Sequence, residues 1–569
     1  MHAPDTTPRP SIFYDYRIHP FRPPPEMAGG RSEAPVVVVG AGPIGLVTAL
    51  DLARFGVRSI VLEQELQVSH GSRALALTRR SLEILQQAGV VAPFMAKGLP
   101  WSSGRTFYRG HEVYRMLLES DPDDRFPPML NLQQQYIEQY LAEAAAAAPL
   151  IDLRWGHQLT GLEQGAAEVR LSVDTPAGAY ALHAPWVVAA DGGRSAVRQM
   201  MGLRMEGRAY AGSFVILDIR ADLGLPTERL CYFDPDWNPH ANVLVHRAPD
   251  GMWRLDFKLP EGETPEAALR PERIAERVAA ILRMIGREVP WELDWGTIYS
   301  ANTLTLADYV HGRVLFTGDA AHLLPIFGVR GANTGLQDCE NLAWKLALVA
   351  RGEAPRALLD SYSHERVRAA REICEEAGKS TRFMTPPSAG YALMRDAVLS
   401  LSLSEAFVRN LLHWRTSRPH DYFDSPLNAF PEADAAIEGG YPCGAPIRNA
   451  RLGPDDYLFD HLGTGFHLIG FPATPDAARR LIPACEAAAA ARPAVRRVVV
   501  TAAPDRWQGL AETVLADPGG RLARRFGMEA GGLYLVRPDL HVAARWREPT
   551  AEKLRAALAI ACGGERVAA

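Results

Sequence analysis

The chain has 569 residues, 47% of them hydrophobic and 22% charged, with a formal net charge of −5. This length suits about three or four domains at roughly 150 residues each, and the weakly acidic balance without a basic patch argues against nucleic-acid binding. Six cysteines without a CxxC pair indicate neither a disulfide framework nor a zinc site, so we expect reduced thiols and no bound metal. Because no segment has the pattern of a signal peptide or a membrane-spanning helix, we expect a cytoplasmic protein that does not bind membranes.

The first informative element, VVVVGAGPIG, begins with a valine run typical of a strand buried on both faces of a parallel sheet. Its glycines, Gly40, Gly42 and Gly45, fit the pattern GxGxxG. Such glycines allow a tight turn and bring a diphosphate close to the first N–H groups of a helix, here starting near Pro43. A second strand over 57–62 leads to Glu63, at the usual distance for accepting hydrogen bonds from a ribose. The pattern indicates a dinucleotide-binding unit.

A second motif, WVVAADGGRSAVR, covers residues 186–198. We predict another buried strand from Trp186 to Ala190, which runs into Asp191 and Gly192 at a close turn. A helix follows, and Arg198 lies in its first turns.

Residues 206–294 alternate apolar and polar side chains and predict a mostly antiparallel sheet with one packed face and one face lining a pocket. Period-two alternation puts one polar and one apolar set on opposite faces: Arg254, Asp256 and Lys258, against Trp253, Leu255 and Phe257. An inward polar set would offer ligands for a phenol or a carboxylate, whereas the alternative is a solvated polar face. His246 and Tyr232 are further pocket candidates.

A third motif, GRVLFTGDAAHLLPIFGVRGANTG, starts at residue 312. A strand from Val314 to Thr317 delivers Asp319 to a loop rich in glycine and proline, and a long amphipathic helix follows from about Asn333. An aspartate at a strand end can bind a ribitol or ribose hydroxyl, and a helix N-terminus can stabilise negative charge on a flat ring.

The remaining chain predicts a helical connection and a separate C-terminal domain. A boundary rich in proline and glycine lies at 439–446, and the strand-like FHLIGF and RRVVVTAA follow it. Near the end, LYLVRPDLHVAARW predicts a hairpin with its bend at Pro538 and Asp539.

In this order and separation, GAGPIG, DGGRSAVR and GDAAHLLP resemble the motifs of single-component FAD-dependent aromatic hydroxylases of the p-hydroxybenzoate hydroxylase and phenol hydroxylase type. The resemblance implies an α/β chain with a Rossmann-like FAD-binding domain, an inserted antiparallel-sheet substrate domain and a thioredoxin-like C-terminal domain. The expected divisions are an N-terminal extension 1–33, an FAD-binding domain 34–205 and 295–385, a substrate domain 206–294, a helical connection 386–440 and a thioredoxin-like domain 441–569 without CxxC.

The same resemblance implies cofactor contacts, carried over residue by residue. The adenosine diphosphate half of FAD would contact Gly40, Gly42, Gly45 and Glu63; a motif serving both FAD and NAD(P)H would include Asp191, Gly192 and Arg198; and the flavin would lie near Asp319, Pro325, Gly331 and Asn333. Arg73 and Gln134 match two further FAD-contacting positions, although residues of these types are usually solvated.

The resemblance also implies the reaction. NADH or NADPH would reduce FAD, and O2 would then form a flavin C4a-hydroperoxide that hydroxylates a small aromatic substrate. No catalytic acid or base can be named from the sequence; the pocket candidates are Arg254, Asp256, His246, Tyr232, Arg330 and Pro325. The C-terminal domain would serve support or dimer contact, so a homodimer stays open.

Three departures from the family pattern affect the flavin loop and the substrate. Ile326 stands where a second proline is common, and Val329-Arg330-Gly331 replaces most of a Gly-Gln-Gly turn. Arg330 would favour a reduced flavin anion or pair with an acidic substrate; the alternative is a solvated loop arginine. Because Arg254 and Arg330 can both serve a carboxylate, we expect a small phenolic or aryl-acid substrate. The aspartate of phenol hydroxylase-like members is replaced by the run 74–77, ALAL.

Three other functions are alternatives to hydroxylation. The segment from Trp291 to Trp295 does not fit the WxWxIP stretch of flavin-dependent halogenases. A Baeyer–Villiger monooxygenase acting on a polyketide-like substrate stays open, as does a non-catalytic flavin-binding protein whose altered GVRG turn disables oxygen activation.

Overall fold

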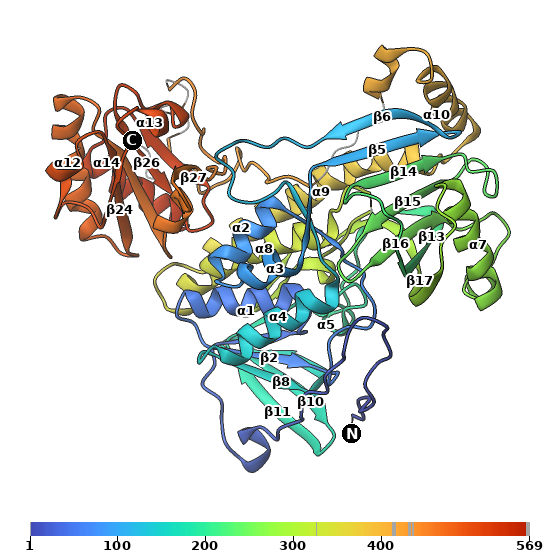
Figure 1. The fold of residues 1–569 in the computed structure, drawn as a ribbon. Coiled ribbons are helices and arrows are strands. Elements are labelled where there is room, and N and C mark those ends of the chain that lie inside the picture. Colours follow the sequence, from blue (N-terminus) through green and yellow to red (C-terminus); the bar gives the residue numbers. More distant parts are fainter. Residues whose placement is uncertain (1, 326, 412–416, 431–433, 435–436, 565–569) are drawn as a thin grey trace.

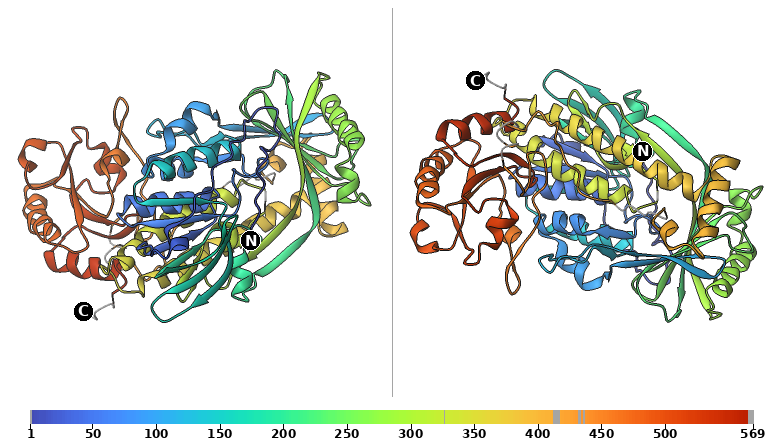
Figure 2. Two further views of the ribbon diagram at one scale, coloured as in Figure 1. Left: turned by 90° about the horizontal axis from the view of Figure 1, so that it is seen from below. Right: turned by 90° about the horizontal axis from the view of Figure 1, so that it is seen from above.

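The computed structural model describes residues 2–325, 327–411, 417–430, 434 and 437–564. Ile326, one of the two departures in the flavin loop, therefore lies outside the described residues. Figures 1 and 2 show a central dinucleotide-binding unit with a large sheet on one side and a C-terminal unit on the other.

The central unit is built on a six-stranded sheet in the order β18-β19-β12-β1-β2-β8. All neighbouring pairs are parallel except β18 with β19. The strands are β1 Val36–Val39, β2 Ser59–Glu63, β8 Ile151–Trp155, β12 Trp186–Ala189, β18 Val310–His311 and β19 Val314–Phe316. Every residue of β1 and β12 is buried, which explains their unbroken apolar sequences and confirms both predicted strands.

Helices cover one side of this sheet, and small sheets complete the unit. Helix α1 (Pro43–Arg54) packs against both α4 (Gln134–Ala147) and α8 (Gly331–Ala350), and α8 packs on α9 (Leu358–Met384). Helix α8 starts two residues before the predicted Asn333. Figure 1 shows the antiparallel β9–β11 sheet on the opposite side. The other elements here are α2 Arg79–Gln87, α3 Val91–Lys97, α5 Ala196–Met200, β3 Ala76–Thr78, β4 Leu99–Trp101, β7 Met129–Asn131, β9 Gln158–Gln164, β10 Val169–Thr175, β11 Gly178–Ala184 and the 3-10 turn η2 Gly318–Ala320.

The large sheet has eight strands in the order β20-β17-β13-β16-β15-β14-β5-β6. Their bounds are β5 Ser103–Tyr108, β6 His111–Leu117, β13 Glu206–Ala221, β14 Arg229–Phe233, β15 Asn242–Arg247, β16 Met252–Lys258, β17 Trp291–Thr305 and β20 His322–Leu323. The strands β13 to β17 pair antiparallel with one another, which confirms the predicted mostly antiparallel sheet, but the sheet as a whole is mixed, because β14 and β5 are parallel. The cause is the β5–β6 hairpin, which comes from the first half of the chain and extends the sheet beyond the 206–294 segment.

Both faces of the large sheet are covered. The outer face carries Trp253, Leu255 and Phe257, which pack into one core with Val278 and Ile281 of α7 (Pro271–Met284). By alternation, Arg254 and Asp256 point the other way, toward the central unit, and both are buried. The alternative of a solvated polar face is therefore wrong for these two residues.

The C-terminal unit has a five-stranded sheet in the order β25-β24-β23-β26-β27. Strands β23 (Phe466–Phe471), β24 (Val495–Thr501) and β25 (Thr513–Ala516) are parallel, and β26 (Gly532–Val536) pairs antiparallel with β23 and β27 (Val542–Trp546), which confirms the predicted hairpin. The helices are α12 Pro475–Ala489, α13 Arg521–Arg525 and α14 Ala551–Ala561, and α10 (Ala389–Leu401) lies in the preceding connection.

A buried ionic network joins the C-terminal unit to the central unit. The carboxylate of Glu365 on α9 accepts hydrogen bonds from Arg537 at 2.6 and 2.9 Å and from Lys345 of α8 at 2.7 Å. Arg537 also binds Asp539, and Asp539 accepts a hydrogen bond from Trp344 of α8 at 3.1 Å. The Arg537 and Lys345 cations hold the pKa of Glu365 far below its usual range against the effect of burial.

None of the helices in the described ranges is both long and apolar enough to span a bilayer. All six cysteines carry free thiols.

Replacing Glu365 by Gln should leave the buried Lys345 without its ion-pair partner and the buried Arg537 with Asp539 alone. We expect a loss of about 3–5 kcal/mol in the free energy of unfolding, measured by urea denaturation. Glu163→Gln is the control, because its pair with Arg170 is exposed (49% and 74% accessible side chains) and should change stability by less than about 1 kcal/mol. Equal effects of the two substitutions would contradict the importance of the buried network.

Candidate active site

The glycine turn between β1 and α1 is shaped for close backbone approach. Gly40 has φ +102°, and a Cβ there would lie 2.6 Å from the carbonyl oxygen of Ala190. A Cβ at Gly45 would lie 1.9 Å from the carbonyl oxygen of Gly40, so the helix can pack on the strand only with glycine. Gly42, in contrast, borders open space, and no side chain caps α1 there. The first N–H groups of α1 are thus available to a diphosphate.

The open space beside Gly42 is called the hollow below, and two carboxylates lie near it, one at the end of β2 and one just after β19. Glu63, at the end of β2, accepts hydrogen bonds from the N–H groups of Ala41 at 2.9 Å and Glu65 at 3.0 Å. Asp319 lies on η2 and remains exposed to water. Protein atoms nevertheless crowd around both groups and raise the pKa of each, that of Glu63 to about 7. Both carboxylates are thus partly enclosed by protein and still reachable from water; hydrogen bonds from cofactor hydroxyls to them stay a prediction.

Residues of the second motif, 186–198, hydrogen-bond to the loop of the third motif, which carries Asp319. Asp191 accepts a hydrogen bond from the N–H of Val197 at 3.0 Å and so holds the first turn of α5. The Arg198 guanidinium donates to the carbonyl oxygens of Gly193 at 2.7 Å and Ala320 at 3.0 Å. Gly192 has open space around it. Arg198 therefore ties the DGGRSAVR turn to the loop that carries Asp319.

Sequence reasoning missed a buried cluster beneath Asp319. Asp338 of α8 accepts hydrogen bonds from the N–H of Gly318 at 3.1 Å, from His322 Nε2 at 2.7 Å and from Arg366 Nε at 2.6 Å. All three side chains are fully buried, and the Arg366 and His322 partners lower the pKa of Asp338 despite its burial. His322 belongs to GDAAH and offered a local signal, but Arg366 lies on α9, far along the chain.

A hydrogen bond joins Gln134 to the backbone of Arg73, but Gln134 is buried whereas the Arg73 side chain is exposed. Gln134 is buried, and its Oε1 accepts hydrogen bonds from the N–H groups of Arg73 at 3.2 Å and Ala74 at 2.9 Å. The Arg73 side chain is exposed, and its charge lowers the pKa of Asp319 against the stronger effect of burial. Arg73 thus faces the same hollow as Asp319.

The flavin loop is fixed by Asn333. Its Oδ1 accepts hydrogen bonds from the Thr78 N–H and Ser81 Oγ, and its Nδ2 donates to the carbonyl oxygens of Ala76 and Val329, all at 2.6–2.9 Å. The Asn333 side chain therefore positions the loop. Gly331 borders open space at the start of α8, where no side chain caps the helix, and Pro325 is buried in the same loop.

Arg330 is buried rather than solvated, which rules out the alternative of a solvent-exposed loop arginine. It is 4% accessible, and its Nε donates to the carbonyl oxygen of Phe327 at 3.3 Å. Its charge acts on the Cys374 thiol of α9. A contact between Arg330 and the flavin stays a prediction.

A row of polar side chains crosses the inner face of the large sheet. Asp218, Arg254, His246 and Arg229 are direct neighbours on β13, β16, β15 and β14. Arg254 donates to both carboxylate oxygens of Asp218, at 2.9 and 2.8 Å, and also to the carbonyl oxygens of Ser72 and Arg73. Most of its donors are therefore used within the protein, which corrects the expectation that Arg254 serves a substrate carboxylate.

Asp256 and His246 keep buried polar atoms without partners. His246 Nε2 lies 4.0 Å from Asp256 Oδ2, whereas His246 Nδ1 and Asp256 Oδ1 have no hydrogen-bond partner among the described residues. Burial raises the pKa of Asp256 to about 7 and, together with the charges of Arg229 and Arg254, keeps the pKa of His246 well below its usual value. Such unpartnered buried groups are costly unless a ligand meets them.

Two of the other pocket candidates are placed differently. Tyr232 lies on the outer face of the sheet, where its ring stacks on Phe107 at 4.7 Å in the core under α7, so its assignment to the pocket is wrong. The reason is alternation, because Cys231 and Phe233 take the inward positions of β14. Lys258 is only half-buried at the end of β16.

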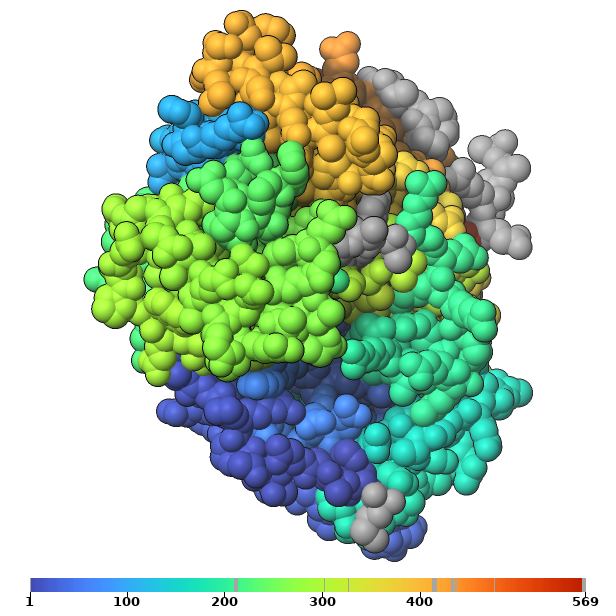
Figure 3. Space-filling view, turned by 90° about the vertical axis from the view of Figure 1, so that its right-hand side faces the viewer, coloured from blue at the N-terminus to red at the C-terminus, as the bar shows by residue number. Residues whose placement is uncertain are grey.

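Apolar side chains frame the polar row. Toward one end, Phe214 and Leu244 form a cluster with Phe327 of the flavin loop. Toward the other end, Met252 packs against Leu75, which follows Arg73. Figure 3 shows a hollow along the seam between the light-green sheet and the dark-blue N-terminal residues. A flat ring bound between these two apolar clusters would lie next to Asp256 and His246.

Comparison with known proteins places the chain among flavoenzymes. A family model described as an FAD binding domain matches residues 33–377, and one described as the HcaD C-terminal domain matches residues 449–561. A 3-(3-hydroxy-phenyl)propionate/3-hydroxycinnamic acid hydroxylase of Mycolicibacterium smegmatis is 30% identical over 535 residues, covering 92% of each chain. Another hydroxylase of this name, from Burkholderia vietnamiensis, is 29% identical and covers 91% of this chain and 94% of the relative.

Solved structures agree in fold. A ternary complex of aklavinone-11 hydroxylase with FAD and aklavinone is 26% identical, with a TM-score of 0.72 over 94% of this chain and 99% of that one. The p-nitrophenol 4-monooxygenase PnpA of Pseudomonas putida is 26% identical, with a TM-score of 0.59 over 67% of this chain and 97% of that one. The flavin-dependent monooxygenase PieE, at 23% identity, has a TM-score of 0.76 over 93% and 98% of the two chains and shows the fold alone.

The buried carboxyl of Asp256 gives a pH-dependent prediction. Its folded-state pKa of about 7 lies above the ordinary 3.8, so the wild-type chain loses stability as the pH rises from about 4 to about 7. Asp256→Asn removes this loss, and its stability advantage should grow over that range, up to about 4 kcal/mol, and then level off. Urea denaturation of the ligand-free chain at pH 5 to 8 measures it. The exposed Asp222→Asn should show no such trend, and an advantage of Asp256→Asn that shrinks with pH would refute the prediction.

Proposed function

The chain belongs to the family of FAD-dependent aromatic ring hydroxylases, and from this premise we propose that its substrate is a phenol carrying a carboxylate side chain, with NADH or NADPH as reductant. Its relatives include hydroxylases of 3-(3-hydroxy-phenyl)propionate over almost its whole length. Family membership favours ring hydroxylation over the Baeyer–Villiger and non-catalytic alternatives.

The hollow of the central unit fits FAD. Open space at Gly42, uncapped first turns of α1 and α8, and the accessible carboxylates of Glu63 and Asp319 offer what a diphosphate, a ring and sugar hydroxyls require. When bound, FAD supplies the reduction of O2 and the transfer of one oxygen atom to the ring. We propose that Arg73 faces the diphosphate, whereas Gln134, Arg198 and Asn333 act by holding the surrounding loops.

The substrate proposal rests on the buried polar row of the inner face. Arg229 brings a buried positive charge to the same row as His246, directly opposite it across β14 and β15. A guanidinium suits a carboxylate, because charge-assisted hydrogen bonds are strong where water is excluded. Asp256 Oδ1 then lies in the neighbouring row, where it can accept a hydrogen bond from the phenol hydroxyl and take its proton.

The aromatic and aliphatic frame would orient the ring and exclude water. Phe214 and Phe327 meet edge to face at 5.1 Å, and Leu244 lies in the same cluster. Their contact closes the pocket on the side of the flavin loop. With Arg229 and Asp256 at fixed positions in the sheet, the ring carbon to be hydroxylated would be held in one orientation toward the cofactor.

For residues 441–569 we retain the proposal of a thioredoxin-like domain without CxxC. Three parallel strands followed by an antiparallel hairpin support it. We propose that this domain braces α8 and α9 through Glu365 and Arg537. For the domain division, we propose that residues 103–117 be added to the substrate domain 206–294, because β5 and β6 pair into its sheet.

The substrate proposal is tested with 3-(3-hydroxyphenyl)propionate and its primary amide. The wild-type enzyme should hydroxylate the acid, and Arg229→Met should raise the KM for the acid by about 30-fold or more while leaving the KM for the amide and the bound FAD unchanged. Arg229→Lys keeps the charge and should recover part of the loss.

Tyr232→Phe is the control, because this ring lies on the far face of the same sheet and its kinetics should match wild type. If the wild-type enzyme hydroxylates the acid and the amide with equal kinetics, it does not recognise the substrate carboxylate. Failure of every phenol tested to yield a hydroxylated product would overturn the proposed substrate class.

A further inference from the structure

The N-terminal residues 7–21, called the strap below, form a segment of their own. They precede the part of the chain matched by the FAD-binding family model, which starts at residue 33, and they contain no helix or strand. Figures 1 and 3 show this dark-blue part of the chain passing from the central unit to the edge of the large sheet.

The strap bridges the two units within four residues. Arg9 pairs with Glu65 at 2.9 Å, and its N–H donates to Gln67 Oε1 at 3.0 Å, both on the loop that follows Glu63. Ser11 Oγ and the N–H of Ile12 then both donate to Oδ1 of Asp294 on β17, each at 2.7 Å. The strap therefore fixes the distance between the dinucleotide-binding unit and the large sheet.

The strap also holds the loop that carries Arg73. The buried Tyr16 donates its hydroxyl hydrogen to the carbonyl oxygen of Ser69 at 3.2 Å and accepts a hydrogen bond from the N–H of Gly71 at 3.1 Å. Ile12 and Phe13 pack against the apolar cluster of Ala248, Met252 and Leu75, the last residue of this loop. Both ends of the loop over residues 69–75 thus contact the strap.

Other elements hold the middle of the same loop. Arg254 of the large sheet donates to the carbonyl oxygens of Ser72 and Arg73, and Gln134 of α4 accepts from the N–H groups of Arg73 and Ala74. With its backbone held by the strap, the large sheet and α4, the loop leaves the Arg73 side chain exposed, where its charge lowers the pKa of Asp319. The backbone position of Arg73 is thus set before any ligand arrives.

We propose that the strap, through Tyr16 and the Ser11–Asp294 contact, positions Arg73 for the diphosphate of FAD and so sets how tightly the chain holds this cofactor. A cation on a preordered loop loses less conformational entropy on binding an anion than one on a mobile loop. Tyr16 acts through Arg73 and is a positioning residue. The inference rests on the proposed contact of Arg73 with the diphosphate of FAD and is independent of the substrate proposed above.

The test is a double-mutant cycle on FAD affinity in the full-length chain, measured by flavin fluorescence. Tyr16→Phe removes one hydroxyl and should raise the Kd for FAD by about fivefold to tenfold. Arg73→Gln should raise the Kd by at least about tenfold and weaken its dependence on salt. In the Arg73→Gln chain, adding Tyr16→Phe should change the Kd by less than about twofold, because the group that Tyr16 positions is gone.

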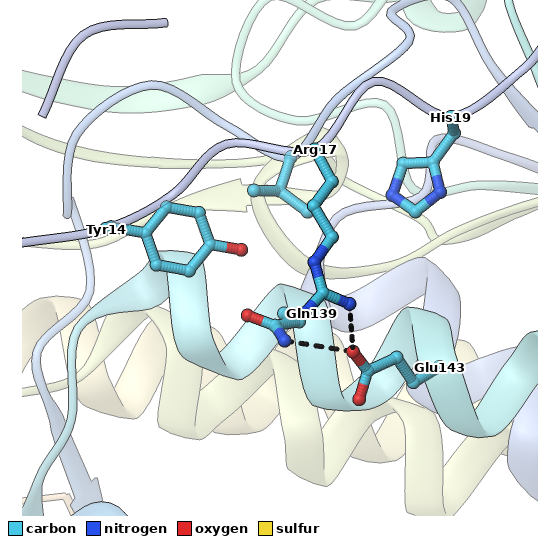
Figure 4. A pocket seen from close by; sticks show the side chains of 6 residues that line it. Tyr14, Arg17, His19, Gln139 and Glu143 are labelled. Atoms are coloured by element: carbon cyan, nitrogen blue, oxygen red, sulfur yellow. Dashed lines mark hydrogen bonds and ion pairs between the residues drawn. The ribbon is translucent and has the colours of Figure 1, made fainter. Parts of the chain in front are cut away.

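A control and a second variant complete the test. Arg17 lies on the same strap but points to Glu143 of α4 at 3.3 Å on the surface, as Figure 4 shows, so Arg17→Gln should leave the Kd for FAD unchanged. Ser11→Ala, which weakens the contact with Asp294, should change the Kd in the same direction as Tyr16→Phe and covers the case in which Tyr16→Phe does not fold. If Tyr16→Phe and Ser11→Ala weaken FAD binding equally with and without Arg73, or not at all, the inference is overturned.

Discussion

A fully buried carboxylate, Asp338, connects the segments that surround the flavin side of the hollow. It accepts hydrogen bonds from Gly318 and His322 of the third motif and from Arg366 of α9. Arg366 in turn donates to the hydroxyl of Tyr422 at 2.8 Å, and the Tyr422 ring stacks on His541 of the C-terminal unit at 4.4 Å. The space that holds a cofactor must stay open, so side chains on its opposite walls cannot bond to one another across it. Here the buried hydrogen bonds of Asp338 and Arg366 hold these walls from the side away from the cofactor.

The local parts of the site could be predicted, because each depends on a few neighbouring residues. The glycines of the β1–α1 turn are required by contacts of 2.6 and 1.9 Å that any side chain would make, and Glu63 follows at a fixed spacing. Strands β1, β2, β12 and β19 of the central sheet were recognisable because burial on both faces requires apolar runs. Each of these constraints involves residues that are close together in the sequence, so it can be seen there as a motif or an apolar run. Strands β8 and β18 carry polar residues and were not predicted.

The failures concern partners that are distant in sequence. Alternation separated the polar set of Arg254 from the apolar set of Trp253, but both faces of the large sheet are buried, so hydrophobicity could not tell which face looks inward. Tyr232 was a pocket candidate without such a pattern, and it lies on the outer face. The Asp218 partner of Arg254 lies on another strand, and its pairing became visible only with the register of β13 and β16. The burial of Arg330 likewise depends on the packing of Phe327 and α9 around it. The strap was recognised only as an extension, because no periodic pattern marks its bridging contacts.

The β5–β6 hairpin has a consequence for recombining such enzymes. Since β5 pairs in parallel with β14, the roof of the pocket is assembled from two stretches of chain that are separated by the second FAD motif. A chimera that exchanges only one contiguous block, residues 206–305, would join the β5–β6 hairpin of one parent to the β13–β17 strands of the other. Transplanting a substrate preference between family members therefore requires at least two exchanged blocks, with crossover points on both sides of the hairpin.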